Sequence, residues 1–271
     1  MRRKYIVLVM GVLAVAGWCA MAHAQKGKKA KPVKLSPEGK AAADLLLGTE
    51  EAQILEGITK LGELAEPGGA KSLIQLLEKG PADKVTEAAL DALGAISNPD
   101  AIPILIEFMH HRRPKVRIIA VNAIAEIKDP RVSAALKTAL SDSDSNVRKA
   151  AAYAIGRYGD TSAIDILFKA FDRNVPEAAI AIGQIGGQDA MERLASYLGK
   201  APLKDLLPGF SQFLGRAEFP LKGKLDIVDK LTELAGPEVK EFLKQYASTL
   251  PADAPLKLRQ KVQGAIESIA D

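Results

Sequence analysis

The sequence predicts an all-α fold, a right-handed α-solenoid of about seven stacked helix pairs. Three observations predict it: a 31-residue repeat, turn chemistry that recurs with the repeat, and apolar residues at helical spacing. The apolar anchors Ile96, Ile127 and Tyr158 stand 31 residues apart. A single unit of this length has too little apolar surface to fold alone, so successive units must stack and share one core.

The first 24 residues have the pattern of a secretory signal peptide. Three basic residues at positions 2–4 precede an apolar run over residues 5–16, and Ala22-His23-Ala24 supplies a small-x-small exit. We expect cleavage after Ala24 and a periplasmic or secreted protein with no transmembrane span. Cleavage would also remove Cys19, the one cysteine, and with it any thiol or disulfide chemistry.

Residues 25–35 form a lysine-rich segment that we expect to act as a flexible tail. Its lysines repel one another, and almost nothing in it can be buried. A solvated linker is the preferred interpretation, and weak contact with an anionic surface is the alternative. The lysines concerned are Lys26, Lys28, Lys29, Lys31 and Lys34. Without the signal segment the formal charge falls from +4 to +1, and without these lysines it is −4. A mildly acidic body does not favour nucleic-acid binding.

The turn after each anchor carries the same chemistry. Asn98, Asp129 and Asp160 stand two residues after the anchors, where the next helix needs an N-cap. Pro99 and Pro130 then take the first helical position, where the missing N–H costs nothing. We therefore predict that one helix ends and another begins at each of these points.

Each anchor ends a helix that starts with a valine. Val85, Val116 and Val147 stand eleven residues before the three anchors. Between valine and anchor the apolar positions form one stripe, which in the third unit consists of Ala150, Ala151, Ala154, Ile155 and Tyr158. Each unit should therefore contain two amphipathic helices of about 12 residues.

The pattern is regular over residues 36–199 and irregular over 200–271, which we interpret as irregular repeats and a cap. The turn signature recurs at Leu234, only 20 residues after the anchor Leu214. Either a helix is missing or the phase of the repeat changes near Phe219-Pro220, and the sequence leaves both open. We expect the phenylalanines clustered there, Phe210, Phe213 and Phe219, to fill the core.

Residues 139–156 carry the best family resemblance. This stretch resembles the HEAT-repeat family, particularly its short bacterial form known from phycobilisome lyases. Such repeats have Asp in the turn between paired helices and Val-Arg at the start of the second helix, and Asp142 and Arg148 fill these places. The resemblance implies that Arg117, Arg148 and Asp142 form a structural ladder between repeats. His111 replaces Asp in the preceding unit, so the ladder should be broken there.

The residues offer little for catalysis or metal binding. After residue 24 the histidines are His110 and His111, whose side chains would point about 100° apart on a helix and could not jointly hold a metal. They indicate an exposed basic turn. We therefore predict no catalytic residue, no metal, no cofactor and no enzymatic activity. The alternative, which the resemblance implies, is an enzyme or chromophore-attachment factor related to HEAT-type lyases.

Surface recognition is the function that remains. In HEAT-like stacks the second helices line the concave side, so equivalent positions form rows across the repeats. The rows fall two, six and ten residues after each valine and contain Ile118, Lys149, Asp91, Asn122, Tyr153, Glu126 and Arg157. We predict an exported scaffold or adaptor that binds a protein or peptide of the cell envelope there. Ordinary solvated helix faces, or tethering to the envelope surface through the basic tail, are the alternatives.

Overall fold

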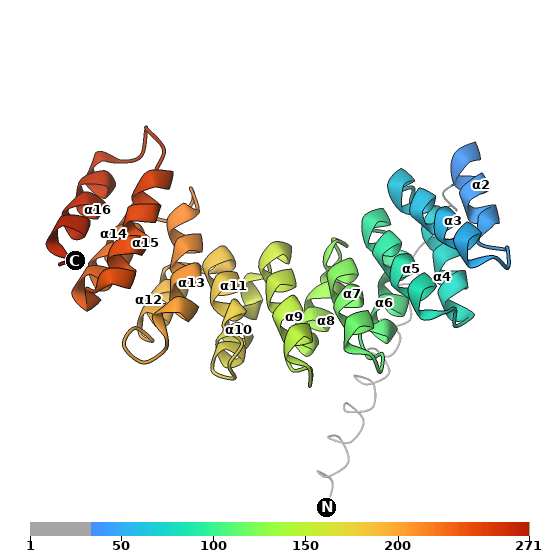
Figure 1. Cartoon of the computed structure of the whole chain (residues 1–271), viewed down its shortest axis with the longest axis horizontal. Coiled ribbons are helices and arrows are strands. Elements are labelled where there is room, and N and C mark those ends of the chain that lie inside the picture. Colours follow the sequence, from blue (N-terminus) through green and yellow to red (C-terminus); the bar gives the residue numbers. More distant parts are fainter. Residues whose placement is uncertain (1–33, 271) are drawn as a thin grey trace, which may run out of the picture. The chain divides into compact units, whose positions relative to one another are not determined.

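The computed structural model describes residues 34–270, and every regular element in that range is helical. From Leu35 onward the chain forms one compact unit in which helical hairpins follow one another in chain order (Figure 1). The predicted all-α solenoid of stacked hairpins is confirmed. Within the described range, no helix combines the length and apolar character that crossing a membrane requires.

Seven helix pairs and a final helix build this unit, and each pair has a first and a second helix. The pairs are α2 (Pro37–Leu45) with α3 (Glu51–Leu64), α4 (Gly69–Glu78) with α5 (Asp83–Ile96), α6 (Ile102–Phe108) with α7 (Pro114–Ala125), α8 (Pro130–Ala139) with α9 (Ser145–Tyr158), α10 (Ile164–Phe171) with α11 (Glu177–Ile185), α12 (Gln188–Ala195) with α13 (Leu203–Gly215), and α14 (Leu221–Leu234) with α15 (Pro237–Thr249). Helix α16 (Leu256–Ser268) follows the last pair, and two short 3-10 turns, η1 (Pro99–Ala101) and η2 (Thr161–Ala163), precede α6 and α10.

The turns between pairs have the predicted caps. The side chains of Asn98, Asp129 and Asp160 each accept a hydrogen bond from the backbone N–H two residues later, at 2.9–3.0 Å. Pro99 and Pro130 occupy the first position of η1 and α8. Each cap satisfies a backbone N–H that has no partner inside its helix, and so fixes where that helix begins.

The second helices pack side by side along the unit, from α3 through α5, α7, α9 and α11 to α13. Small residues allow this close approach. A Cβ atom on Gly94 would lie 2.9 Å from the Cα of Ala123, and one on Gly183 would lie 2.2 Å from the carbonyl oxygen of Gly209. The row of second helices therefore forms a continuous wall that can carry a surface site.

The irregular segment is explained by a change of phase. Leu234 ends α14, so the turn signature that follows it joins the two helices of one pair, whereas the earlier anchors end second helices. The predicted core positions are confirmed, since Phe210, Phe213 and Phe219 are buried and the last two rings lie 4.9 Å apart. Arg216 Nη1 donates to the carbonyl oxygens of Gly183, at 2.9 Å, and Gly186, at 2.7 Å, which attaches the α13–α14 connection to the end of α11.

The N-terminal predictions fall outside the described residues. The signal peptide over 1–24 and the tail lysines Lys26, Lys28, Lys29 and Lys31 lie in the part of the chain that the structure does not describe. Lys34, the last lysine of the tail, is exposed. Cleavage, export and contact with an anionic surface therefore stay predictions.

Candidate functional site

The predicted row of Asp91, Asn122 and Tyr153 lies on the exposed side of three adjacent second helices, α5, α7 and α9. All three residues are exposed. Tyr153, which is 38% exposed, is one of the few large hydrophobic residues in the described range that remain open to solvent. The equal spacing of the repeat places them at the same height on neighbouring helices. The structure therefore brings these three predicted residues to one face.

Three charged members of the predicted rows, Glu126, Arg157 and Lys149, are paired across neighbouring helices. Glu126 Oε1 lies 3.0 Å from Arg157 Nη1, and Lys149 Nζ lies 2.8 Å from Glu177 Oε1. The side chains of Glu126 and Arg157 are each about half exposed, so their pairing adds little stability. These charges connect α7 with α9 and α9 with α11, and a partner would meet them as ion pairs.

Uncharged residues of the same helices lie beside the paired charges. Ile118 and Asn122 of α7 and Tyr153 of α9 are among them, and Ile180 occupies the corresponding position of α11, five residues before the anchor Ile185. We call these four residues the neutral strip. Ile118 and Ile180 are half-buried. The sequence prediction missed Ile180 because Val175 and the anchor Ile185 are ten residues apart instead of eleven, so the equivalent position falls five residues after the valine and not six.

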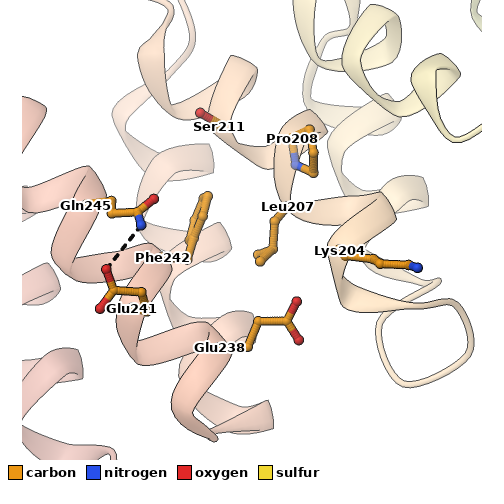
Figure 2. Close-up of a pocket in the computed structure, with 8 residues that line it drawn as sticks. All are labelled: Lys204, Leu207, Pro208, Ser211, Glu238, Glu241, Phe242 and Gln245. Atoms are coloured by element: carbon orange, nitrogen blue, oxygen red, sulfur yellow. Dashed lines mark hydrogen bonds between the residues drawn. The ribbon is translucent and has the colours of Figure 1, made fainter.

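Beyond α11 the row of second helices opens into a groove. A cavity of about 370 Å³ separates α13 from α15. Figure 2 shows Leu207 of α13 and Phe242 of α15 pointing into this space, whereas Lys204 points away from it. Pro208 also lines the groove, and its ring nitrogen has no hydrogen to donate to the preceding turn of α13. On the far wall, Gln245 Nε2 donates to Glu241 Oε1 at 3.1 Å.

Asp91 has an unusual electrostatic environment. Partial burial of its carboxyl and the nearby charge of Glu87 raise the pKa of Asp91, and Lys115 opposes them only in part. Glu87 itself binds Arg113 and Lys115, both at 2.6 Å. Of the described carboxylates with a resolved shift, Asp91 alone has a raised pKa. A raised pKa brings a carboxyl closer to the range that proton transfer near neutral pH requires.

The predicted ladder residues meet at the turn between α8 and α9. Arg117 is buried, and its Nε and Nη2 donate to the two carboxylate oxygens of Asp142 at 2.9 and 2.7 Å. Its Nη1 donates to the carbonyl oxygen of His111 at 2.9 Å. Arg148 Nη1 donates in the same way to the carbonyl oxygen of Asp142 at 2.9 Å. His111 thus contributes its backbone to this network where the family pattern has an Asp side chain.

The histidine pair does not form a site with its neighbours. His111 stacks on Phe108 with ring centroids 6.0 Å apart, and its Nδ1 accepts from the backbone N–H of Arg113 at 3.2 Å. His110 is exposed. Across residues 34–270, no three His, Cys, Asp or Glu side chains are grouped so as to hold a metal ion.

Comparison with protein families identifies the repeat. The family model for HEAT repeats matches residues 70–141 and 108–177. Residues 70–177 are HEAT repeats. The resemblance carried by residues 139–156 is thereby confirmed, and the exposed faces of α5, α7 and α9 are faces of HEAT repeats.

Comparison with known structures finds, among others, two that are similar to this chain. One is a homology model of the full-length AP-3 complex, and the match covers 86% of this chain and 51% of the AP-3 chain, with a TM-score of 0.57 and 13% identity. The other is the complex of CpcE and CpcF of phycocyanin lyase from Nostoc sp., and the match covers 90% of this chain and 97% of the matched chain, with a TM-score of 0.48 and 18% identity. The likeness to the AP-3 model, at 13% identity, concerns the fold alone.

Two curated relatives are similar in sequence to part of the chain. Phycocyanobilin lyase subunit alpha of Nostoc sp. is 31% identical over 108 residues, or 40% of this chain and 39% of the relative. The subunit of the same name from Synechocystis sp. is 30% identical over 113 residues, or 41% and 42%. The chain thus spans about two fifths of the length of these relatives.

These relatives correct one prediction. The expectation of no enzymatic activity is wrong, because both relatives are named as subunits of a lyase. Searching the sequence for histidines, cysteines and metal-ligand spacings cannot find a carboxyl whose pKa is raised by its neighbours in the folded chain. The raised pKa of Asp91 depends on Glu87 and on partial burial, and these become visible only in the folded structure.

Proposed function

We propose that this protein is the HEAT-repeat subunit of a lyase-type enzyme that acts on phycocyanobilin, or on a chemically similar group, together with a protein partner. The observation that carries the proposal is the 31% identity over 108 residues with a phycocyanobilin lyase alpha subunit. The fold supports it because a row of second helices offers a broad face for a protein partner, with no rearrangement of the core.

In this proposal the partner docks on the neutral strip. Tyr153 supplies a large amphipathic ring at low entropy cost, which is the kind of residue that dominates binding at protein interfaces. The ion pair between Glu126 and Arg157 lies beside it and would belong to the polar rim. Uncharged residues at the centre with paired charges around them match the usual anatomy of a recognition surface.

Asp91 is the residue that we assign to proton transfer. It occupies the position on α5 that corresponds to Asn122 and Tyr153, so a partner on the neutral strip would lie next to it. Its raised pKa keeps a larger share of the carboxyl protonated than an ordinary aspartate would have. Asp91 can therefore act as an acid beside the docked partner.

The test is a reconstitution with phycocyanobilin, apo-phycocyanin and the other phycocyanin lyase subunit. We expect the full chain to capture apo-phycocyanin and to speed the covalent attachment of phycocyanobilin, followed by the fluorescence of the product on a denaturing gel. Tyr153→Ala should weaken capture roughly tenfold or more. Asp91→Asn should leave capture intact and slow attachment roughly a hundredfold or more.

The matched control is Lys169→Ala, which changes an exposed residue on the first helix α10, away from the neutral strip. This variant should behave like the wild-type chain in both measurements. Absence of both capture and attachment with the wild-type chain would overturn the proposed function. Equal loss in the Lys169→Ala and Tyr153→Ala variants would overturn the assignment of the neutral strip.

A further inference from the structure

A second cavity lies where the regular repeat breaks down. It has a volume of about 410 Å³ and is enclosed by the C-terminal ends of α13 and α15, the start of α14, and the segment that leads into α16. Leu214, Phe219 and Leu258 line it and are themselves buried. Its volume falls in the range of pockets that take small organic molecules, and its walls are mostly apolar, as in such pockets.

Lys224 and Tyr246 are hydrogen-bond donors that line this cavity, together with the hydroxyl groups of Ser211 and Thr249. Lys224 of α14 is half-buried, and within the described residues no carboxylate lies at ion-pair distance from its ammonium group. Tyr246 of α15 is also half-buried, and its hydroxyl donates only to the carbonyl oxygen of Leu214, at a long 3.5 Å. An ammonium group that is partly shielded from water and has no carboxylate at ion-pair distance is less well solvated, and an acceptor bound in the cavity would stabilise it.

The electrostatics of both groups agree with this reading of the geometry. Burial lowers the pKa of Lys224. The negative charge of Glu218 acts to raise this pKa, and the positive charge of Arg216 acts to lower it. Burial raises the pKa of Tyr246 to about 12, which keeps its hydroxyl a donor. Glu218 is already bound to Arg216 Nε at 2.7 Å, and Asp253 is an exposed residue of the cavity wall. A negatively charged acceptor from outside the chain would satisfy Lys224 and Tyr246 together.

We propose that this cavity binds a small apolar molecule that carries one carboxylate, with the carboxylate on Lys224 and Tyr246 and the hydrocarbon part against Leu214, Phe219 and Leu258. A carboxylate suits the pair because it accepts from both donors and neutralises the ammonium group. The side chains of Leu214, Phe219 and Leu258 favour hydrocarbon for the rest of the molecule. This site is separate from the neutral strip, and the inference does not rest on the proposed lyase function.

The experiment is calorimetric titration of the full chain with octanoate, with octanol and octylamine as comparison ligands of similar length. We expect octanoate to bind and both comparison ligands to bind at least roughly tenfold more weakly. Lys224→Met, which keeps most of the side-chain volume and removes the charge, should weaken octanoate binding roughly ten- to a hundredfold. Tyr246→Phe should weaken it by roughly threefold to tenfold.

Two further variants keep the test decisive. Lys222→Met is the matched control, since Lys222 is an exposed lysine of the same helix that does not line the cavity, and it should bind octanoate like the wild-type chain. Ala217→Trp fills the cavity from an exposed position of its wall and should abolish binding even if Lys224→Met fails to fold. Binding of octanol as tightly as octanoate, or unchanged octanoate binding in the Lys224→Met or Ala217→Trp variant, would overturn the proposal.

Discussion

The contact between α11 and α13 makes a sharp prediction about two glycines. A Cβ atom on Gly183 would lie 2.2 Å from the carbonyl oxygen of Gly209 and 2.7 Å from the Cβ of Gln212. Because the first of these atoms belongs to the backbone of α13, Gly183→Ala forces the two helices apart. A Cβ on Gly62 of α3 would instead lie 3.4 Å from the Cβ of Ala92, which is an ordinary contact.

The magnitudes follow from these distances. Replacing glycine by alanine inside a helix stabilises it by about 0.5–1 kcal/mol, and Gly62→Ala should show this gain. At Gly183 the same gain is opposed by overpacking, which costs about 1–3 kcal/mol and more where backbone must move. We therefore expect Gly183→Ala to lower the free energy of unfolding by about 1–2 kcal/mol.

Urea denaturation followed by far-ultraviolet circular dichroism measures both effects. The transition midpoint should rise for Gly62→Ala and fall for Gly183→Ala, with little change in the slope of the transition. A Gly183→Ala variant as stable as Gly62→Ala would refute the close approach of α11 and α13. Because α13 also forms one wall of the groove in Figure 2, a displaced α13 would change that groove as well.

Two further predictions concern acid stability and export. Burial would raise the pKa of Asp160, but hydrogen bonds from Lys137, Ser133 and Ser162 outweigh it and hold this pKa well below its ordinary value of 3.8. A depressed pKa in the folded state gives stability that is present above pH 3.8 and lost as the pH falls further. The Asp160→Asn variant should therefore be less stable than the wild-type chain at neutral pH, and its free energy of unfolding should fall less between neutral pH and pH 3. Urea denaturation of both chains at each pH measures this difference. For export, mass spectrometry of the chain recovered from its native host should find Gln25 at the N-terminus, and an intact Met1 would contradict the predicted cleavage.

The sequence was sufficient for those parts of the fold that local chemistry decides. The caps at Asn98, Asp129 and Asp160 need only residues within two positions, so they could be predicted together with the helix that each one starts. The stacking followed from the small apolar area of each unit. The phase change was left open because the turn after Leu234 looks the same whether it joins two helices of one pair or of different pairs.

The candidate site was predictable only in part, because its properties depend on contacts between repeats. The row of Asp91, Asn122 and Tyr153 follows from the repeat spacing alone. The pairing of Glu126 with Arg157 and the raised pKa of Asp91 depend on distances between neighbouring helices, which the sequence does not give. The groove beside Phe242 depends on where α15 lies after the phase change, so the sequence pattern did not predict it.

The second helices meet differently in the regular and the irregular parts of the chain. Where the repeat is regular, neighbouring second helices approach closely and present an outer surface that suits a protein partner, whereas the cavities of this part lie between α2 and α3 and between α6 and α8. Where the phase changes, α15 does not pack against α13 as α13 packs against α11; one cavity lies between α13 and α15, and a second is enclosed by their ends, the start of α14 and the segment that leads into α16. Deleting α14 to α16 should therefore abolish octanoate binding, whereas capture of a protein partner on the neutral strip depends on α7 to α11 and needs no residue of the deleted helices.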